Sequence, residues 1–256
     1  MTNIRQLAGE AARYSTFNRE ERNCVAMLYH ALLTGQNLAA FMSAAGYTAS
    51  FSQDEVEVFV EWSYLRDLWH RVTDEQTRRH VILDMLGLAN TEDLMGWPPD
   101  RFNTYFGATP TPSVLYIQSP ATWSISRFSQ TIADNEEFHR ACRLKWAFRV
   151  KPDLVIQPDA DHALCVEAKW ESGEGRYPAV ASEIAEFNRR GLPRASQTEI
   201  QRFMMEDLLG IDAEFRYLTR KSPHKPSANS MTWKAAFETL DLSACPPFLR
   251  RWVEHR

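Results

Sequence analysis

The chain has 256 residues, of which 44% are hydrophobic and 24% charged, a composition typical of a globular protein with a sizeable core. Its net charge of −4 excludes the overall basic excess of a protein that binds nucleic acid over most of its surface. Four widely separated cysteines without a Cys-x-x-Cys pair predict buried reduced thiols rather than a zinc site or a disulfide framework.

The first hundred residues predict helices. Capping patterns at 18–21, 52–55 and 73–76 each precede apolar residues at helical spacing. The second of these helices would carry apolar side chains on two sides, which indicates burial between partners. A helical domain is therefore expected over 1–108, ending at the Gly- and Pro-containing stretch 107–112.

The sequence offers no sign of membrane attachment. The amino terminus lacks an apolar signal core, and polar residues interrupt the uncharged stretch 23–53 before it is long enough to cross a bilayer. We expect a soluble, cytoplasmic protein without a membrane partner.

The remainder of the chain predicts an α/β domain over 109–256. Two short apolar runs at 154–156 and 163–166 flank a Pro-Asp-Ala-Asp turn, which is typical of a β-hairpin. The other expected elements are a strand at 114–117, helices at 129–146, 179–190 and 196–209, a strand at 215–219, and helices at 233–240 and 247–254.

Two carboxylates and one ammonium group converge on the predicted hairpin. Asp153 precedes its first strand, and Glu167 and Lys169 end its second. Because side chains alternate along a strand, Glu167 and Lys169 share the face opposite to Val166 and Ala168. Such a group suits a divalent metal and an attacking water. The alternative is an exposed hairpin whose charges face solvent.

Pro152-Asp153, a spacer and Glu167-Ala168-Lys169 resemble the motif of the PD-(D/E)XK nuclease superfamily, whose members have the restriction-endonuclease-like fold. The resemblance covers residues 113–225. It implies an α/β (α+β) domain with a mixed central sheet flanked by helices. It also implies a Mg²⁺- or Mn²⁺-dependent nuclease that hydrolyses phosphodiester bonds in DNA, an endonuclease of restriction or anti-phage defence.

The resemblance assigns a role to each motif residue. Asp153 and Glu167 are the expected metal ligands, and the main-chain carbonyl of Ala168 is a third. Lys169 would orient the attacking water and stabilise the transition state. It would accept a proton only if its surroundings lowered its pKa.

Helix residues complete the expected site. The superfamily usually adds a glutamate from a helix before the first strand, and both Glu136 and Glu137 fit by separation. Glu137 is preferred because it lies closer to the apolar face of its helix. Gln197 and Gln201 share a face of the later helix and are expected near the metal or phosphate, with a polar helix surface as the alternative.

Basic residues that could contact phosphate form three groups in the sequence. Segment 211–256 has a net charge of +3, so its group is favoured, with Arg220 and Lys221 as the expected contacts. The other two groups are Arg140, Arg143 and Lys145, and Arg189, Arg190 and Arg194. His139 and His162 are expected to be noncatalytic.

Partners and the biological role stay open in the sequence. The helical domain could regulate the site, bind a partner subunit or form a homodimer, since cutting two strands takes two sites. One rival hypothesis is a catalytically silent nuclease-fold binding module, which the intact Asp153, Glu167 and Lys169 disfavour. Another is a nuclease directed at RNA, because contacts to the 2′-hydroxyl are not legible in a sequence.

Overall fold

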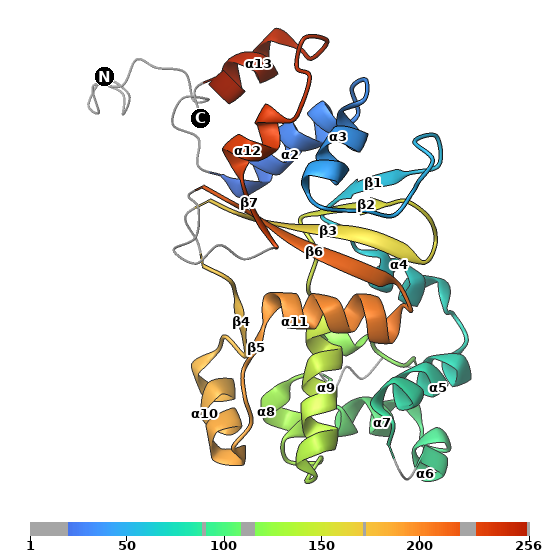
Figure 1. The fold of residues 1–256 in the computed structure, drawn as a ribbon. Helices are drawn as coiled ribbons and strands as arrows, with labels where there is room; N and C mark the ends of the chain where they lie inside the picture. Colours follow the sequence, from blue (N-terminus) through green and yellow to red (C-terminus); the bar gives the residue numbers. More distant parts are fainter. Residues whose placement is uncertain (1–19, 89–90, 109–115, 171–172, 221–228, 255–256) are drawn as a thin grey trace, which may run out of the picture. The chain divides into compact units, whose positions relative to one another are not determined.

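The computed structural model describes residues 20–88, 91–108, 116–170, 173–220 and 229–254 (Figure 1). The chain is a mixed α/β protein that divides into two compact units. Unit 1 takes residues 1–61, 152–173 and 214–256, and unit 2 takes 62–151 and 174–213. Each unit thus contains residues from both sides of the boundary expected at residue 108. In unit 1, a strand at 57–60 pairs with a strand at 154–157 across that boundary.

Unit 1 is built on a five-stranded mixed sheet with the order β1-β2-β3-β6-β7. β1, β2 and β3 are successively antiparallel, and β6 and β7 are parallel. The pairing of β2 with β3 confirms the expected hairpin. The strands are β1 (Glu57–Val60), β2 (Leu154–Gln157), β3 (His162–Lys169), β6 (Asp212–Thr219) and β7 (Ser230–Thr232).

The presence of β1 corrects the expectation of an all-helical amino-terminal domain. Residues 57–60 form a strand at the sheet edge, and the helix expected over this region begins only at Tyr64. Val58, Phe59 and Val60 are β-branched or aromatic and fit a pleated surface better than a helix. The apolar spacing on which the helical prediction depended belongs to two different elements.

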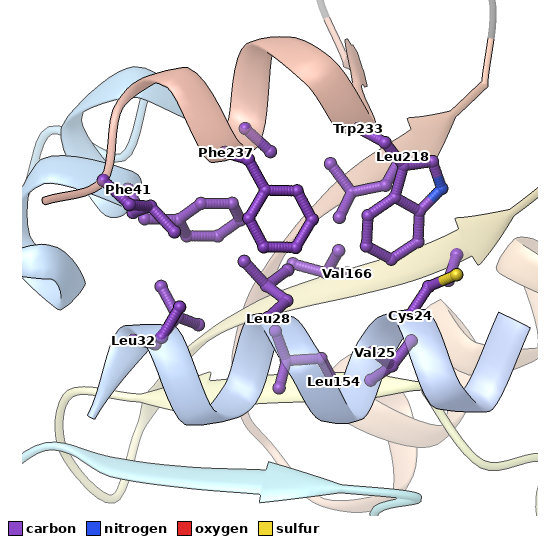
Figure 2. Packing of buried hydrophobic residues seen from close by; sticks show 14 of the residues in the cluster. Cys24, Val25, Leu28, Leu32, Phe41, Leu154, Val166, Leu218, Trp233 and Phe237 are labelled. Atoms are coloured by element: carbon purple, nitrogen blue, oxygen red, sulfur yellow. The ribbon is translucent and has the colours of Figure 1, made fainter. Parts of the chain in front are cut away.

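Four helices pack with the sheet in unit 1: α2 (Glu21–Leu32), α3 (Asn37–Ala44), α12 (Trp233–Glu238) and α13 (Pro247–Glu254). Figure 2 shows their shared core, in which Leu28 of α2 and Phe237 of α12 approach Leu154 and Val166 of the hairpin. Leu154, Val166 and Ala168 all point into this core. Strand alternation therefore turns Glu167 to the opposite face.

Unit 2 is mainly helical and has a small two-stranded sheet, β4 (Arg176–Tyr177) and β5 (Ala195–Ser196). The capping box predicted from Ser196 and Glu199 is confirmed. The helices are α4 (Tyr64–Arg71), α5 (Glu75–Leu86), α6 (Thr91–Met95), α7 (Pro99–Tyr105), η2 (Pro120–Thr122), α8 (Ile125–Phe128), α9 (Asn135–Ala147), α10 (Ala181–Arg190), α11 (Gln197–Arg202) and the π-helical η3 (Phe203–Leu208).

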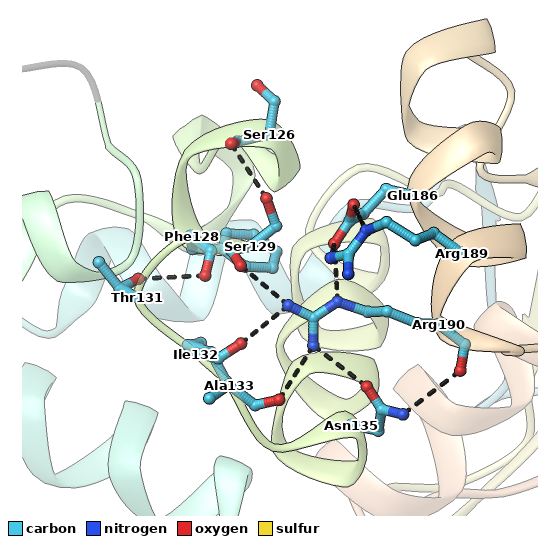
Figure 3. Close-up of polar contacts among 10 residues, drawn as sticks. All are labelled: Ser126, Phe128, Ser129, Thr131, Ile132, Ala133, Asn135, Glu186, Arg189 and Arg190. Atoms are coloured by element: carbon cyan, nitrogen blue, oxygen red, sulfur yellow. Dashed lines mark hydrogen bonds and ion pairs between the residues drawn. The ribbon is translucent and has the colours of Figure 1, made fainter.

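Arg190 at the end of α10 connects this helix to the turn between α8 and α9 through hydrogen bonds (Figure 3). Its guanidinium donates to the carbonyls of Ser129, Ile132 and Ala133 and to the side chains of Asn135 and Glu186. One buried side chain thereby satisfies the carbonyls of the turn between α8 and α9, which would otherwise lack donors.

All four cysteines are buried free thiols. The helix expected at 129–146 begins at residue 135, where Asp134 caps it. The strand expected at 114–117 and the cap at Asn18 lie largely outside the described residues. Within the described part of the chain, no helix has the length and apolar character needed to cross a bilayer.

Candidate functional site

The hairpin register places Asp153 across from Glu167. Leu154 pairs with Val166 in the antiparallel ladder, so the register continued by one residue sets Asp153 opposite Glu167. Leu154 and Val166 face the core, and the next pair therefore faces away from it. The side chains that the sequence predicted to converge are thus brought together by the strand pairing itself.

Hydrogen bonds fix these side chains in place. The Ala168 amide donates to Oδ2 of Asp153 at 2.8 Å, and Nζ of Lys169 lies 2.6 Å from Oε1 of Glu167. Glu167 is buried at 3% exposure, and the Lys169 side chain is 14% exposed. The alternative of charges that face solvent therefore does not describe this group.

Burial and like charge together raise the pKa of Asp153 to about 7. Burial has the largest effect, the neighbouring Glu167 carboxylate adds to it, and Glu61 contributes further. The Ala168 amide and the Lys169 ammonium act in the opposite direction but do not cancel the increase. The half-buried Asp153 and the buried Glu167 thus share one ammonium group, and their negative charge is only partly compensated.

Lys169 is held in its protonated form. Burial lowers the pKa of Lys169, but the charge and hydrogen bond of Glu167 outweigh this effect. With Asp153 and Glu21 contributing in the same sense, the pKa lies above its usual value. The low pKa that a proton acceptor would need is absent from this arrangement, so Lys169 acts here as a donor and a positive charge.

Two further carboxylates approach the group, and the sequence analysis missed both. Glu61 follows β1, and its amide donates to the carbonyl of Asp153 at 3.0 Å, while its side chain lies 3.3 Å from Nε of Arg22. Glu21, in the first turn of α2, accepts from the amide of Trp170 at 2.7 Å. The sequence marks Glu21 only as part of the capping pattern at 18–21, and a prediction of β1 would have pointed to Glu61.

Glu136 and Glu137 belong to α9 in unit 2. Glu136 is exposed and forms an ion pair with Arg140 at 2.5 Å, which is the ordinary role of a surface helix charge. Glu137 is half-buried. The pKa of Tyr105 is raised mainly by the burial of Tyr105 itself and further by the negative charge of Glu137. The first strand of the sheet is β1, which α2 and α3 precede and α9 follows, so the assumption that α9 comes before the first strand was wrong.

The remaining predicted contacts are placed separately. Gln197 opens α11 and is half-buried, and Gln201 is fully buried, so a polar helix surface does not describe Gln201. Arg220 is exposed, and its guanidinium lies 5.6 Å from the ring centre of Trp170 in unit 1. Lys221 lies outside the described residues. His162 contacts Asp159 in the hairpin turn, as expected of a structural histidine.

The hairpin group offers few side chains that could bind a metal ion. Among the described residues, no three or more His, Cys, Asp or Glu side chains are grouped so as to hold a metal ion. Asp153 and Glu167 are two carboxylates, and the third expected ligand, the carbonyl of Ala168, is a main-chain atom.

No known protein family, curated protein or solved structure matches this chain.

Proposed function

We propose that this protein is a divalent-metal-dependent nuclease that hydrolyses phosphodiester bonds in DNA, with a restriction-endonuclease-like core in unit 1. The observation that carries the proposal is the half-buried Asp153 and the buried Glu167, set opposite each other by the strand register with Lys169 beside them. The order of α2, β1, β2 and β3, with β6 as the next strand of the sheet, supports the fold assignment. Restriction or anti-phage defence is the role that the motif implies.

The residues present fit Mg²⁺ or Mn²⁺. Asp153 and Glu167 offer hard carboxylate oxygens, and the raised pKa of Asp153 indicates that the pair lacks full positive compensation. With the Ala168 carbonyl they would hold the ion, and no His or Cys joins them as zinc would favour. When bound, such an ion supplies charge neutralisation and lowers the pKa of water.

The protein's own groups carry the other parts of the reaction. Lys169, held as an ammonium, donates hydrogen bonds that orient the attacking water and stabilise negative charge on the phosphoryl oxygens. Glu167 fixes the position of that ammonium through the 2.6 Å contact. The Ala168 amide fixes Asp153 in the same way. The site is thereby preorganised, because Asp153 and Lys169 are each held by a hydrogen bond to another residue of the hairpin.

Glu21 takes the place that Glu137 was expected to fill. It lies on α2, one of the two helices before β1, and its charge raises the pKa of Lys169. Its carboxylate already accepts from the Trp170 amide just beyond the motif. We therefore assign the helix-borne acidic role to Glu21 in this proposal.

The experiment is a cleavage assay on the purified full-length chain. Supercoiled plasmid, linear duplex, single-stranded DNA and RNA are each incubated with Mg²⁺, with Mn²⁺ and with EDTA. Metal-dependent cleavage of DNA that EDTA stops is the expected result. Cleavage of RNA alone would move the substrate to the rival class, and activity unaffected by EDTA would contradict the metal-dependent reaction.

One observation favours the rival hypothesis of a silent binding module. The 2.6 Å contact between Lys169 and Glu167 partly neutralises one proposed metal ligand from within the protein. A chain that binds DNA with unchanged affinity in Mg²⁺ and EDTA, and cuts none of the four substrates, would establish this module instead.

A further inference from the structure

Phe59 of β1 is an aromatic side chain exposed at the edge of the unit 1 sheet. It is 36% exposed, and β1 comes first in the strand order, with β2 as its neighbour in the described sheet. A single exposed apolar residue is ordinary on a protein surface. Phe59 differs from such a residue in its position relative to Asp153.

The strand register places Phe59 on the face that carries the proposed reactive group. Phe59 pairs with Val155, and two residues further along the same ladder the Glu61 amide donates to the carbonyl of Asp153. Side chains two residues apart share a face, whereas Val58 between them packs against the core on the other side. The Phe59 ring therefore lies on the face of Asp153, displaced from it by roughly 7 Å along the strands.

The charges on this face determine which part of a nucleic acid fits over the ring. Asp153, Glu167 and Glu61 contribute carboxylates, and Lys169 provides positive charge beside the first two. A phosphate is attracted to Lys169 and repelled by a surface of carboxylates. The group that contacts the Phe59 ring must therefore be uncharged, as a nucleobase is.

We propose that Phe59 stacks on a nucleobase next to the phosphodiester bond that is cleaved, so that the protein acts on single-stranded or unpaired DNA. A nucleobase presents a flat π-face to an aromatic side chain, whatever its sequence. In a duplex these faces are covered by the neighbouring base pairs, so the contact requires a base that has left the stack. This inference rests on the nuclease function proposed above and names the substrate class within it.

The first test measures binding apart from cleavage. Fluorescence anisotropy of labelled oligonucleotides is recorded with the full-length chain in Ca²⁺, a hard cation that takes the same oxygen ligands as Mg²⁺. The wild type should bind a single strand at least about fivefold more tightly than the same sequence as a duplex. Phe59→Leu should weaken single-strand binding by at least about fivefold, because it removes the stacking ring.

Phe248→Leu is the matched control. Phe248 is 46% exposed on α13, a helix of unit 1 that packs through Leu249 and Trp252 into the core on the opposite face of the sheet. This variant loses an exposed ring of the same kind and should bind the single strand as the wild type does. Phe59→Tyr keeps the ring and should bind within about twofold of the wild type.

A substrate change tests the same contact from the other side. Single-stranded oligonucleotides that each carry one abasic position are compared along the strand. One position should weaken binding to the wild type by at least about fivefold, because the base that stacks on Phe59 is missing. The same abasic strand should bind Phe59→Leu no more weakly than the intact strand does. The wild-type part of this comparison remains decisive if Phe59→Leu fails to fold.

The outcomes separate this inference from the nuclease function. If the wild type binds or cuts DNA while Phe59→Leu matches it, or while Phe248→Leu loses as much as Phe59→Leu, the stacking role of Phe59 is wrong and the nuclease function stands. Equal binding of single strand and duplex, or abasic strands that all bind like the intact one, would overturn it as well. If the wild type neither binds nor cuts any DNA, the nuclease function fails and this inference fails with it.

Discussion

Each unit contains carboxylates beside basic side chains, but the pKa of a carboxylate is lowered in one unit and raised in the other. In unit 2, hydrogen bonds from Arg189, with those from Arg190, lower the pKa of Glu186 to about 2. In unit 1, burial and the nearby Glu167 raise the pKa of Asp153 to about 7. The first carboxylate has two guanidinium partners, and the second shares one ammonium with another carboxylate.

This difference separates a structural charge cluster from a candidate reactive one. A carboxylate whose negative charge is fully matched stabilises the folded state, whereas a buried and poorly matched one destabilises it. Proteins retain such destabilising groups mainly where the chemistry needs them. The comparison therefore favours unit 1 as the site of reaction and the Arg190 cluster as part of the scaffold.

The largest expected effect is on cleavage. Glu167→Gln and Asp153→Asn should each lower the rate of metal-dependent DNA cleavage by about 10²- to 10⁴-fold, because each removes a metal ligand but keeps the side-chain shape. Glu57→Gln, an exposed carboxylate on β1, should cut at the wild-type rate. Initial rates on plasmid with Mg²⁺ make the comparison, and equal losses in all three variants would contradict it.

The next effect is on the stability of unit 2. Arg190→Met should lower the free energy of unfolding by about 3–5 kcal/mol, because it leaves Glu186 and several carbonyls without their donor. Arg189→Met is the control, since this side chain is 64% exposed and, among the described residues, is paired with Glu186, so this change should lower the free energy of unfolding much less. Urea unfolding measures both variants, and similar losses in the free energy of unfolding would show that the hydrogen bonds of Arg190 do not stabilise unit 2.

The two clusters should also respond to pH in opposite directions. Asp153 has a raised folded-state pKa, so the folded protein binds more protons than the unfolded chain between about pH 4 and 7, and its contribution to stability falls as the pH rises through that window. Glu186 has a lowered pKa, so its contribution is lost as the pH falls from about 4.5 towards 2.

Asp153→Asn isolates the first of these effects. At pH 8 it should raise the free energy of unfolding by about 1–3 kcal/mol, and it should flatten the dependence between pH 4 and 7. Asp161→Asn in the exposed hairpin turn should change neither. Unfolding curves across this pH range provide the measurement, and a loss of stability in Asp153→Asn at pH 8 would mean that its charge is better matched than we infer.

The sequence predicted the hairpin and its charged face because both depend on local information. A turn between two apolar runs sets the strand pairing, and the period of two then assigns Glu167 and Val166 to opposite faces. The capping box at Ser196 and Glu199 was equally legible, since it lies within four consecutive residues.

The parts that could not be predicted depend on long-range pairing. β1 is a four-residue edge strand whose partner, β2, lies almost a hundred residues later, and its β-branched and aromatic residues are too few to outweigh the helical spacing that runs through them. Because β1 was not predicted, the first hundred residues were expected to be helical, and α9 was taken as the helix before the first strand. The cavity of unit 2 that Arg143 and Arg194 line was hidden for the same reason, because no local pattern joins α9 to the turn after α10.

The smallest predicted effect concerns Glu61, where the edge strand meets the site. Glu61 has φ of 55°, a left-handed conformation that costs an ordinary residue about 1 kcal/mol or more. Glu61→Ala removes the carboxylate but keeps this strain, whereas Glu61→Gly removes both. The glycine variant should therefore be more stable than the alanine variant by about 0.5–1 kcal/mol, although its unfolded chain is more flexible. Both variants retain the amide that donates to the Asp153 carbonyl, so the strand ladder is the same in each. If thermal unfolding ranks alanine above glycine, the left-handed turn is not a source of strain, and Glu61 then influences Asp153 through its charge alone.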